Sequence, residues 1–323
     1  MFQFHPILKS VLWGGDRLAA YKGLDTDQCQ IGESWEISGM EGRESVVASG
    51  PEAGRTLIEL IAKYRDRLVG AGVYARYGNE FPLLVKLIDA GSDLSLQVHP
   101  DDSTAARRHG CPGKTEMWYI IDADPGACIL AGFDREVDAT QFERIARDGS
   151  LLHAVRHYPS HAGDAFFLPP GTIHSIGAGN LLAEIQQSSD ITYRVYDYNR
   201  RDAMGNQREL HTAQAREVLD FGCHGQHVLH ASRHPLAACP HFVVDHCTVD
   251  GTRNLPTAGI DSFVVLLCLS GDLTVTCAQP LAEGLGTAAL RQGQSLLIPA
   301  CATRLRLVGH ARLLAAWMPK SEK

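Results

Sequence analysis

The stretch that decides the fold is Gly163-Asp-Ala-Phe-Phe-Leu-Pro-Pro-Gly-Thr-Ile-His174, in which a turn glycine precedes an apolar run and a second turn precedes a histidine. A related stretch, Gly293-Gln-Ser-Leu-Leu-Ile-Pro299, repeats its order of glycine, polar residue, small residue, three apolar residues and proline. Each stretch lies in a region of short strand-like runs. The repeat therefore indicates two jelly-roll-like barrels in tandem.

Strand-like runs bounded by Gly, Pro, Asp or Asn recur along the whole chain. They fall at 81–89, 94–99, 116–121, 165–168, 181–186, 191–197, 242–249, 262–269, 272–277, 295–298 and 304–308. Helical patterns are fewer: apolar spacing predicts helices over 56–69 and 212–221. A capping box at Thr140-Gln-Phe-Glu143 predicts another helix that stops near Gly149. We therefore expect a mainly-β chain of two tandem barrels with a few added helices.

The composition excludes several classes of protein. The chain has 323 residues, a net charge of −7 and no basic stripe, so we expect no nucleic-acid partner. No apolar run is long enough for a membrane helix, and the first residues lack a signal-peptide pattern. The nine cysteines form no C-x-x-C pair. We expect a reduced, cytoplasmic protein without structural disulfides, present as a monomer or weak homo-oligomer.

Four residues form a candidate metal-ligand set, each within or at the end of a strand-like run. They are Gln97, His99, Glu116 and His174. Residues two apart on a strand share a face, so Gln97 and His99 are expected to point the same way. Imidazole nitrogens with a carboxylate and an amide oxygen suit Zn²⁺ or a similar divalent ion. Spacing alone also permits four unrelated polar residues on sheet faces.

The second repeat lacks this chemistry, because Arg304 stands where the first repeat has His174. We therefore expect a catalytic unit at 1–222, a connector at 223–240 and a second, metal-free barrel at 241–323. The histidines between His224 and His234 are irregularly spaced. They indicate a solvated loop rather than a metal site.

The pattern Gly-x5-Pro-x-Gly-x2-His at 163–174 resembles the second cupin motif, with Ala178 in place of its final Asn. In the first cupin motif Gln97 replaces a His, and Glu116 comes unusually late. With these departures, the chain resembles type I phosphomannose isomerases over residues 1–222 and only in architecture beyond them. The stretches that carry the resemblance are 12–15, 32–38, 81–90, 94–102, 113–119 and 184–197.

The resemblance implies an isomerase that interconverts mannose 6-phosphate and fructose 6-phosphate through a cis-enediolate. It implies one Zn²⁺ per chain, bound by the four candidate ligands, and an active-site arginine at Arg194. It also places Lys86, Ser95, Lys114 and Glu184 around the sugar-phosphate pocket. The catalytic base stays open between Glu184, Lys114 and a metal-bound water.

Strand parity adds expectations about neighbouring side chains. Lys114 lies two residues before Glu116 and is expected beside the ligands. Two interpretations of Lys114 stay open, a proton carrier and a solvated lysine in a loop. Glu184 and Arg194 have equal parity and are expected to face one cavity. Arg194 has a structural alternative, an ion pair with Asp190 or Asp197.

Lys86 lies in an apolar run and needs an anionic partner. We expect Asp89 or a substrate phosphate to provide it.

Two other functions compete with the isomerase. One is a metal-dependent cupin oxygenase, and the other is a non-catalytic sugar-phosphate-binding relative. Retention of Gln97 and Arg194 disfavours the first. The second is expected to have lost a ligand or the arginine, and this chain has kept both.

Overall fold

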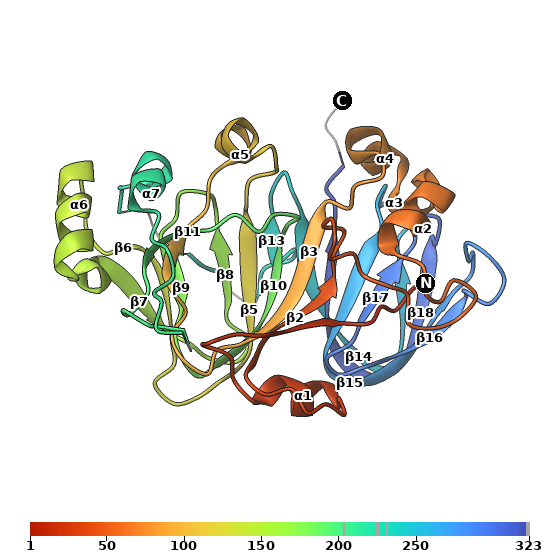
Figure 1. Cartoon of the computed structure of the whole chain (residues 1–323). Coiled ribbons are helices and arrows are strands. Elements are labelled where there is room, and N and C mark those ends of the chain that lie inside the picture. The colour runs from red at the N-terminus through yellow and green to blue at the C-terminus, as the bar shows by residue number, and fades with distance from the viewer. Residues whose placement is uncertain (203, 224–226, 230–231, 321–323) are drawn as a thin grey trace.

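The computed structural model describes residues 1–202, 204–223, 227–229 and 232–320. The prediction of a mainly-β cupin fold with added helices is confirmed (Figure 1). The helices are α1 (Arg17–Lys22), α2 (Leu57–Tyr64), α3 (Asp66–Val69), α4 (Ala71–Tyr77), α5 (Asp102–His109), α6 (Ala139–Asp148) and α7 (Thr212–Val218), with a 3-10 turn at Leu151–Ala154.

The first β system consists of two sheets. A seven-stranded sheet has the order β1 (Ile7–Ser10), β2 (Ile31–Ile37), β3 (Leu83–Asp89), β10 (Asn180–Gln187), β5 (Glu116–Ala123), β8 (Ala165–Leu168) and β12 (Val228–Leu229). A five-stranded sheet has the order β11 (Tyr193–Tyr196), β4 (Leu96–Val98), β9 (His174–Ile176), β6 (Cys128–Phe133) and β7 (Val155–Pro159). One apolar cluster, including Trp118, Ile129, Ile176 and Leu182, joins the two sheets.

The second β system is a sheet of the order β13 (Ala237–Ala238), β14 (Val243–Pro256), β18 (Arg304–Trp317), β15 (Val264–Cys277) and β16 (Thr287–Arg291), with β17 (Ser295–Ile298) paired to β15. It lies beside the first system, with β2 and β3 between them in Figure 1. A shared core cluster contains Val85 and Ile185 from one system and Val265 and Leu314 from the other. The strands β3 and β10 are therefore buried on both faces.

The turn–strand repeat predicted from sequence is present, because β8 and β17 occupy the two equivalent runs. Two helix predictions need correction. The helix expected over 56–69 is interrupted at Arg65, whose φ of 49° ends α2 before α3 begins. The capping box of α6 is formed by Asp138 and Gln141, since the Asp138 carboxylate accepts the Gln141 N–H at 2.7 Å.

The expected connector at 223–240 lies partly outside the described residues, including His224. Its described part contributes β12 to the first system and β13 to the second. Helix α7 begins as expected but ends at Val218. Among the described residues, no helix is long and apolar enough to cross a membrane.

Candidate active site

The seven-stranded sheet brings acidic and basic side chains onto its inner face by register. Glu184 on β10 lies opposite Lys86 on β3 and Trp118 on β5, and Gln186 lies opposite Glu116. Directly opposed residues of antiparallel strands project from the same face. These side chains therefore point towards the five-stranded sheet, while their odd-numbered neighbours on β3 and β10 fill the shared core.

The five-stranded sheet supplies the other side. Gln97 on β4 lies opposite both His174 on β9 and Arg194 on β11. His99 follows β4 directly and shares the parity of Gln97. The five-stranded sheet thus places Gln97, His99 and His174 opposite Glu116 of the seven-stranded sheet.

The four candidate ligands converge. His174 Nε2 lies 3.2 Å from His99 Nε2 and 3.2 Å from Glu116 Oε1, and His99 Nε2 lies 3.5 Å from Glu116 Oε2. The Gln97 side-chain amide lies 3.3 Å from His174 Nε2, and a flip of this amide would present its oxygen instead. Ligand atoms about 2.1 Å from a tetrahedral metal are roughly 3.4 Å apart, so these separations fit one ion.

The outer contacts of both histidines favour ligation through Nε2. Nδ1 of His99 lies 2.8 Å from the Ile191 carbonyl oxygen, and Nδ1 of His174 lies 2.8 Å from that of Thr172. Each Nδ1–H therefore donates to a backbone carbonyl, which leaves the Nε2 lone pair facing the cluster. Two such lone pairs and a carboxylate at these distances fit a divalent metal ion between them.

The electrostatics favour the ligand forms. Burial lowers the pKa of His99 well below its ordinary value, with a further contribution from Lys114, so its imidazole is neutral. Burial alone would raise the pKa of Glu116, but Lys114 and the two histidines hold that pKa well below its ordinary value. A neutral imidazole and an ionised carboxylate are the forms that bind metal.

Lys114 lies where parity predicted. Its Nζ is 2.9 Å from Glu116 Oε2 and 3.0 Å from His99 Nε2, and its side chain is buried. The alternative of a solvated lysine is therefore wrong.

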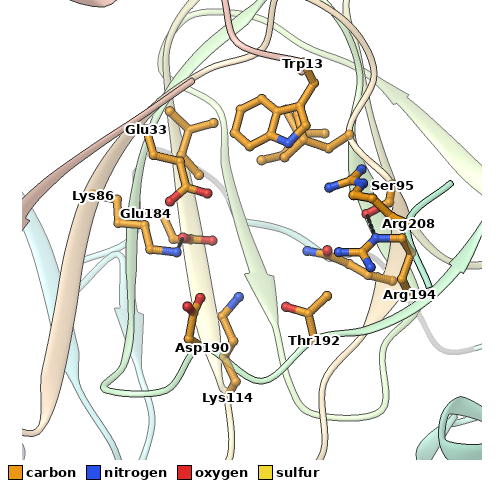
Figure 2. A pocket seen from close by; sticks show the side chains of 14 residues that line it. Trp13, Glu33, Lys86, Ser95, Lys114, Glu184, Asp190, Thr192, Arg194 and Arg208 are labelled. Carbon is orange, nitrogen blue, oxygen red and sulfur yellow. Dashed lines mark hydrogen bonds and ion pairs between the residues drawn. The ribbon is translucent and has the colours of Figure 1, made fainter. Parts of the chain in front are cut away.

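A cavity of about 320 Å³ opens beside the cluster (Figure 2). Gln97 and Lys114 belong both to its lining and to the cluster. Of the other predicted site residues, Lys86, Ser95, Glu184 and Arg194 also line it. The expectation that Glu184 and Arg194 face one cavity is thus confirmed, although they lie in different sheets.

Lys86 forms a buried ion pair with Glu184 at 2.8 Å, and Glu184 also accepts the Trp118 indole N–H at 2.9 Å. Burial would lower the pKa of Lys86, but Glu184 raises it above the ordinary value. The expectation that Asp89 pairs with Lys86 is wrong. Positions 86 and 89 differ by an odd number, so they face opposite sides of β3, and Asp89 binds Arg17 at 2.8 Å.

Arg194 is held by neutral groups. Its Nε donates to Ser95 Oγ at 3.3 Å, and a terminal nitrogen donates to the Glu209 carbonyl at 3.0 Å. The acidic residues offered as its alternative partners bind elsewhere among the described residues: Asp190 pairs with Arg43, and Asp197 pairs with Arg200 and Arg208. The guanidinium of Arg194 is therefore available to the cavity.

Sequence reasoning missed several residues of the lining. They are Trp13, Glu33, Thr192 and Arg208, together with Asp190 in this role. Figure 2 shows Arg208 beside Arg194 on one wall, with Lys86 and Lys114 across the cavity. Arg208 lies outside any regular strand, so no parity pattern marks it. What ties Arg208 to the site is its ion pair with the Asp197 carboxylate, at 2.5 Å.

Fold and site together define a cupin-type enzyme with a candidate metal cluster beside a cationic cavity. The family model of the type I phosphomannose isomerase catalytic domain matches residues 1–124. The mannose-6-phosphate isomerase of Streptococcus mutans is 35% identical, with 94% of each chain covered. The mannose-6-phosphate isomerase ManA of Bacillus subtilis is 35% identical, with 97% of each covered. A crystal structure of mannose 6-phosphate isomerase from Bacillus subtilis superposes with a TM-score of 0.85 at 31% identity, covering 98% of both chains. The chain belongs to the type I phosphomannose isomerase family.

Proposed function

We propose that this chain interconverts mannose 6-phosphate and fructose 6-phosphate through a cis-enediolate, with one Zn²⁺ bound by Gln97, His99, Glu116 and His174. The observation that carries the proposal is the convergence of two Nε2 atoms and a carboxylate to within 3.2–3.5 Å beside a cationic cavity. A divalent ion held there would stabilise the negative charge that develops on O1 and O2 of the sugar.

The cations of the cavity have different tasks. Lys86 and Lys114 are engaged by buried carboxylates, whereas Arg194 binds only neutral groups among the described residues. A guanidinium can grip a dianionic phosphate or an enediolate through two parallel hydrogen bonds. Arg194 is assigned to the charge of the transition state, with Ser95 fixing its orientation.

The isomerisation removes the proton from C2 of mannose 6-phosphate and returns a proton to C1, while the hydroxyl proton moves from O2 to O1. Among the titratable side chains that line the cavity, we assign proton exchange to Glu184 or Lys114. Each is tied to a buried partner, Lys86 for Glu184 and Glu116 for Lys114. These ties hold the side chains at fixed positions along the sugar. The base stays open among the three candidates of the sequence analysis, and the pH profiles of Glu184 and Lys114 variants test the two side chains.

The wider assignments follow from this proposal. Residues 1–222 carry the reaction, 223–240 connect, and 241–323 form a supporting barrel. The nine free thiols of the whole chain suit a reducing cytoplasm. The chain acts as a monomer or weak homo-oligomer.

The test is a coupled assay for fructose 6-phosphate with mannose 6-phosphate or free mannose as substrate, before and after chelation. Activity should be lost on chelation and restored by Zn²⁺. Free mannose should lose kcat as well as affinity, because binding energy from the phosphate holds C1 and C2 in place. Equal kcat/KM for the two sugars would overturn the substrate assignment, and full activity after verified metal removal would overturn the metal.

A further inference from the structure

A second group of metal-type ligands lies in the second β system, away from the proposed active site. His234 precedes β13, and Asp245 and His246 lie near the start of β14. Nδ1 of His234 is 3.0 Å from Asp245 Oδ1, and Nδ1 of His246 is 3.7 Å from the same oxygen. The two imidazoles stack with ring centroids 4.8 Å apart. All three ligand atoms lie within 4.8 Å of one another.

These side chains line a cavity of about 210 Å³, together with Arg253, Thr257 and a largely apolar wall. Asp245 lies opposite Ala315 and shares its parity with Cys247 and Val249, which belong to the core of the second system. Its carboxylate therefore lies at the rim of that core. The apolar wall includes Leu255, Ile260, Val264 and Trp317. Polar ligands at one end of an apolar cavity are typical of a small-molecule or metal site.

One ligand atom has no hydrogen-bond partner. Nδ1 of His246 is buried and accepts or donates no hydrogen bond among the described residues, although the backbone N–H of His246 donates to Asp245 Oδ1 at 2.8 Å. Buried polar atoms are seldom left unsatisfied, so this nitrogen calls for a ligand. An ion bound about 2.1 Å from each donor in a tetrahedral site places donors roughly 3.4 Å apart. The two separations from Asp245 Oδ1, 3.0 and 3.7 Å, bracket this value.

We propose that His234, Asp245 and His246 bind one divalent transition-metal ion through Nδ1, Oδ1 and Nδ1, with an open coordination position towards the cavity. Two imidazoles and a carboxylate favour Zn²⁺, Co²⁺ or Ni²⁺ over Mg²⁺ or Ca²⁺. This departs from the expectation of a metal-free second barrel. That expectation rested on Arg304, whereas these ligands come from β14 and the segment before β13.

The site should bind more weakly than the proposed active-site cluster. The side chain of His234 is 61% exposed, and those of Asp245 and His246 are 29% and 28% exposed. Water and side-chain motion therefore compete with the ion, and no backbone carbonyl is found holding either imidazole in the ligating orientation among the described residues.

The test is Co²⁺ binding to the full chain after chelation, measured by equilibrium dialysis with elemental analysis and by visible absorption. His246→Ala and Asp245→Asn should each bind one Co²⁺ fewer per chain than the wild type at the same free Co²⁺. The matched control is His161→Ala. It removes a histidine that lies 3.3 Å from Asp164 but is not part of a cluster with another histidine, so this variant should bind Co²⁺ as the wild type does.

The two sites are distinguished by His174→Ala, which should lose the other ion and keep the absorption that His246→Ala abolishes. Isomerase activity and thermal melting of His246→Ala and Asp245→Asn, and thermal melting alone for His174→Ala, show that the fold is intact. The isosteric Asp245→Asn covers the case in which His246→Ala misfolds. Unchanged Co²⁺ content in both His246→Ala and Asp245→Asn would overturn the second site without bearing on the first.

Discussion

The two His-and-carboxylate clusters of this chain use the same residue types in opposite surroundings. His99, Glu116 and His174 are at most 2% exposed, and both imidazoles are oriented by backbone carbonyls. His234, Asp245 and His246 lie at a rim, partly open to solvent. The comparison shows that the identity of the ligand residues alone does not determine how rigidly a metal site is held. Strand register and outer hydrogen bonds fix the first cluster, whereas the second depends on the ion to order it.

The two turn–strand repeats differ in the same way. After β8, the chain turns and enters β9, which places His174 opposite Gln97 and Ala131 in the five-stranded sheet. After β17, it turns and enters β18, where Arg304 begins the strand exposed to solvent. One turn therefore delivers a side chain into a closed interior, and the other delivers it to the solvent-exposed start of β18, a strand paired on both sides.

The largest expected effect comes from removing a buried ligand. His174→Ala should lose metal and isomerase activity together, by more than the roughly 10–100-fold that changes in outer contacts cause. Arg304→Ala, the equivalent position of the second repeat, should change neither. Metal content by elemental analysis and kcat/KM check both. Full metal content in His174→Ala would contradict the ligand assignment.

The next largest effect is expected from removing the guanidinium of Arg194, which binds only neutral groups among the described residues. Arg194→Ala should lower kcat by about 10²–10³-fold with a smaller change in KM, because the contact strengthens in the transition state. Arg312→Ala is the control from the second β system, where Arg312 donates to Ser270 Oγ at 3.0 Å. If steady-state kinetics showed a change in KM alone, Arg194 would be a uniform phosphate ligand.

The buried ion pair tests stability. Lys86→Met should lower the free energy of unfolding by about 3–5 kcal/mol, because it leaves Glu184 buried without its cation. Lys63→Met removes the exposed partner of Glu52 and should cost much less, because solvent screens that pair. Urea unfolding measures both. Adding Glu184→Gln to Lys86→Met should recover part of the loss, and no recovery would argue against the pair.

The smallest effect concerns Asp197, which holds Arg200 and Arg208 beside the cavity. Burial would raise the pKa of Asp197, but the two arginines hold it below its ordinary value. The stabilisation is therefore present above about pH 4, the ordinary value of an aspartate, and is lost as the pH falls through the lower folded value. Asp197→Asn should cost about 1.5–3 kcal/mol at pH 7 and less in acid.

Its control in the second β system is Asp250→Asn, since Asp250 and His310 form an exposed pair at 2.8 Å. Urea unfolding of both variants between pH 3 and 7 tests the contrast. A cost for Asp197→Asn that did not shrink in acid would mean that its charge is not what stabilises the wall.

The sequence by itself determined what depends on neighbours along the chain. Two-residue parity placed Lys114 beside Glu116, and the repeat of glycine, apolar run and proline predicted β8 and β17. The same parity rule excludes the pair of Lys86 with Asp89, because positions 86 and 89 differ by an odd number and their side chains cannot share a face. These features are local, since alternation along a strand needs no knowledge of its partner.

Only the tertiary structure decided which strands lie opposite one another. The register of β10 between β3 and β5 paired Lys86 with Glu184, and the pairing of β4 with β9 brought Gln97 to His174. Such contacts depend on sheet order and on cores that bury distant strands together, and neither is written in the spacing of residues along the chain.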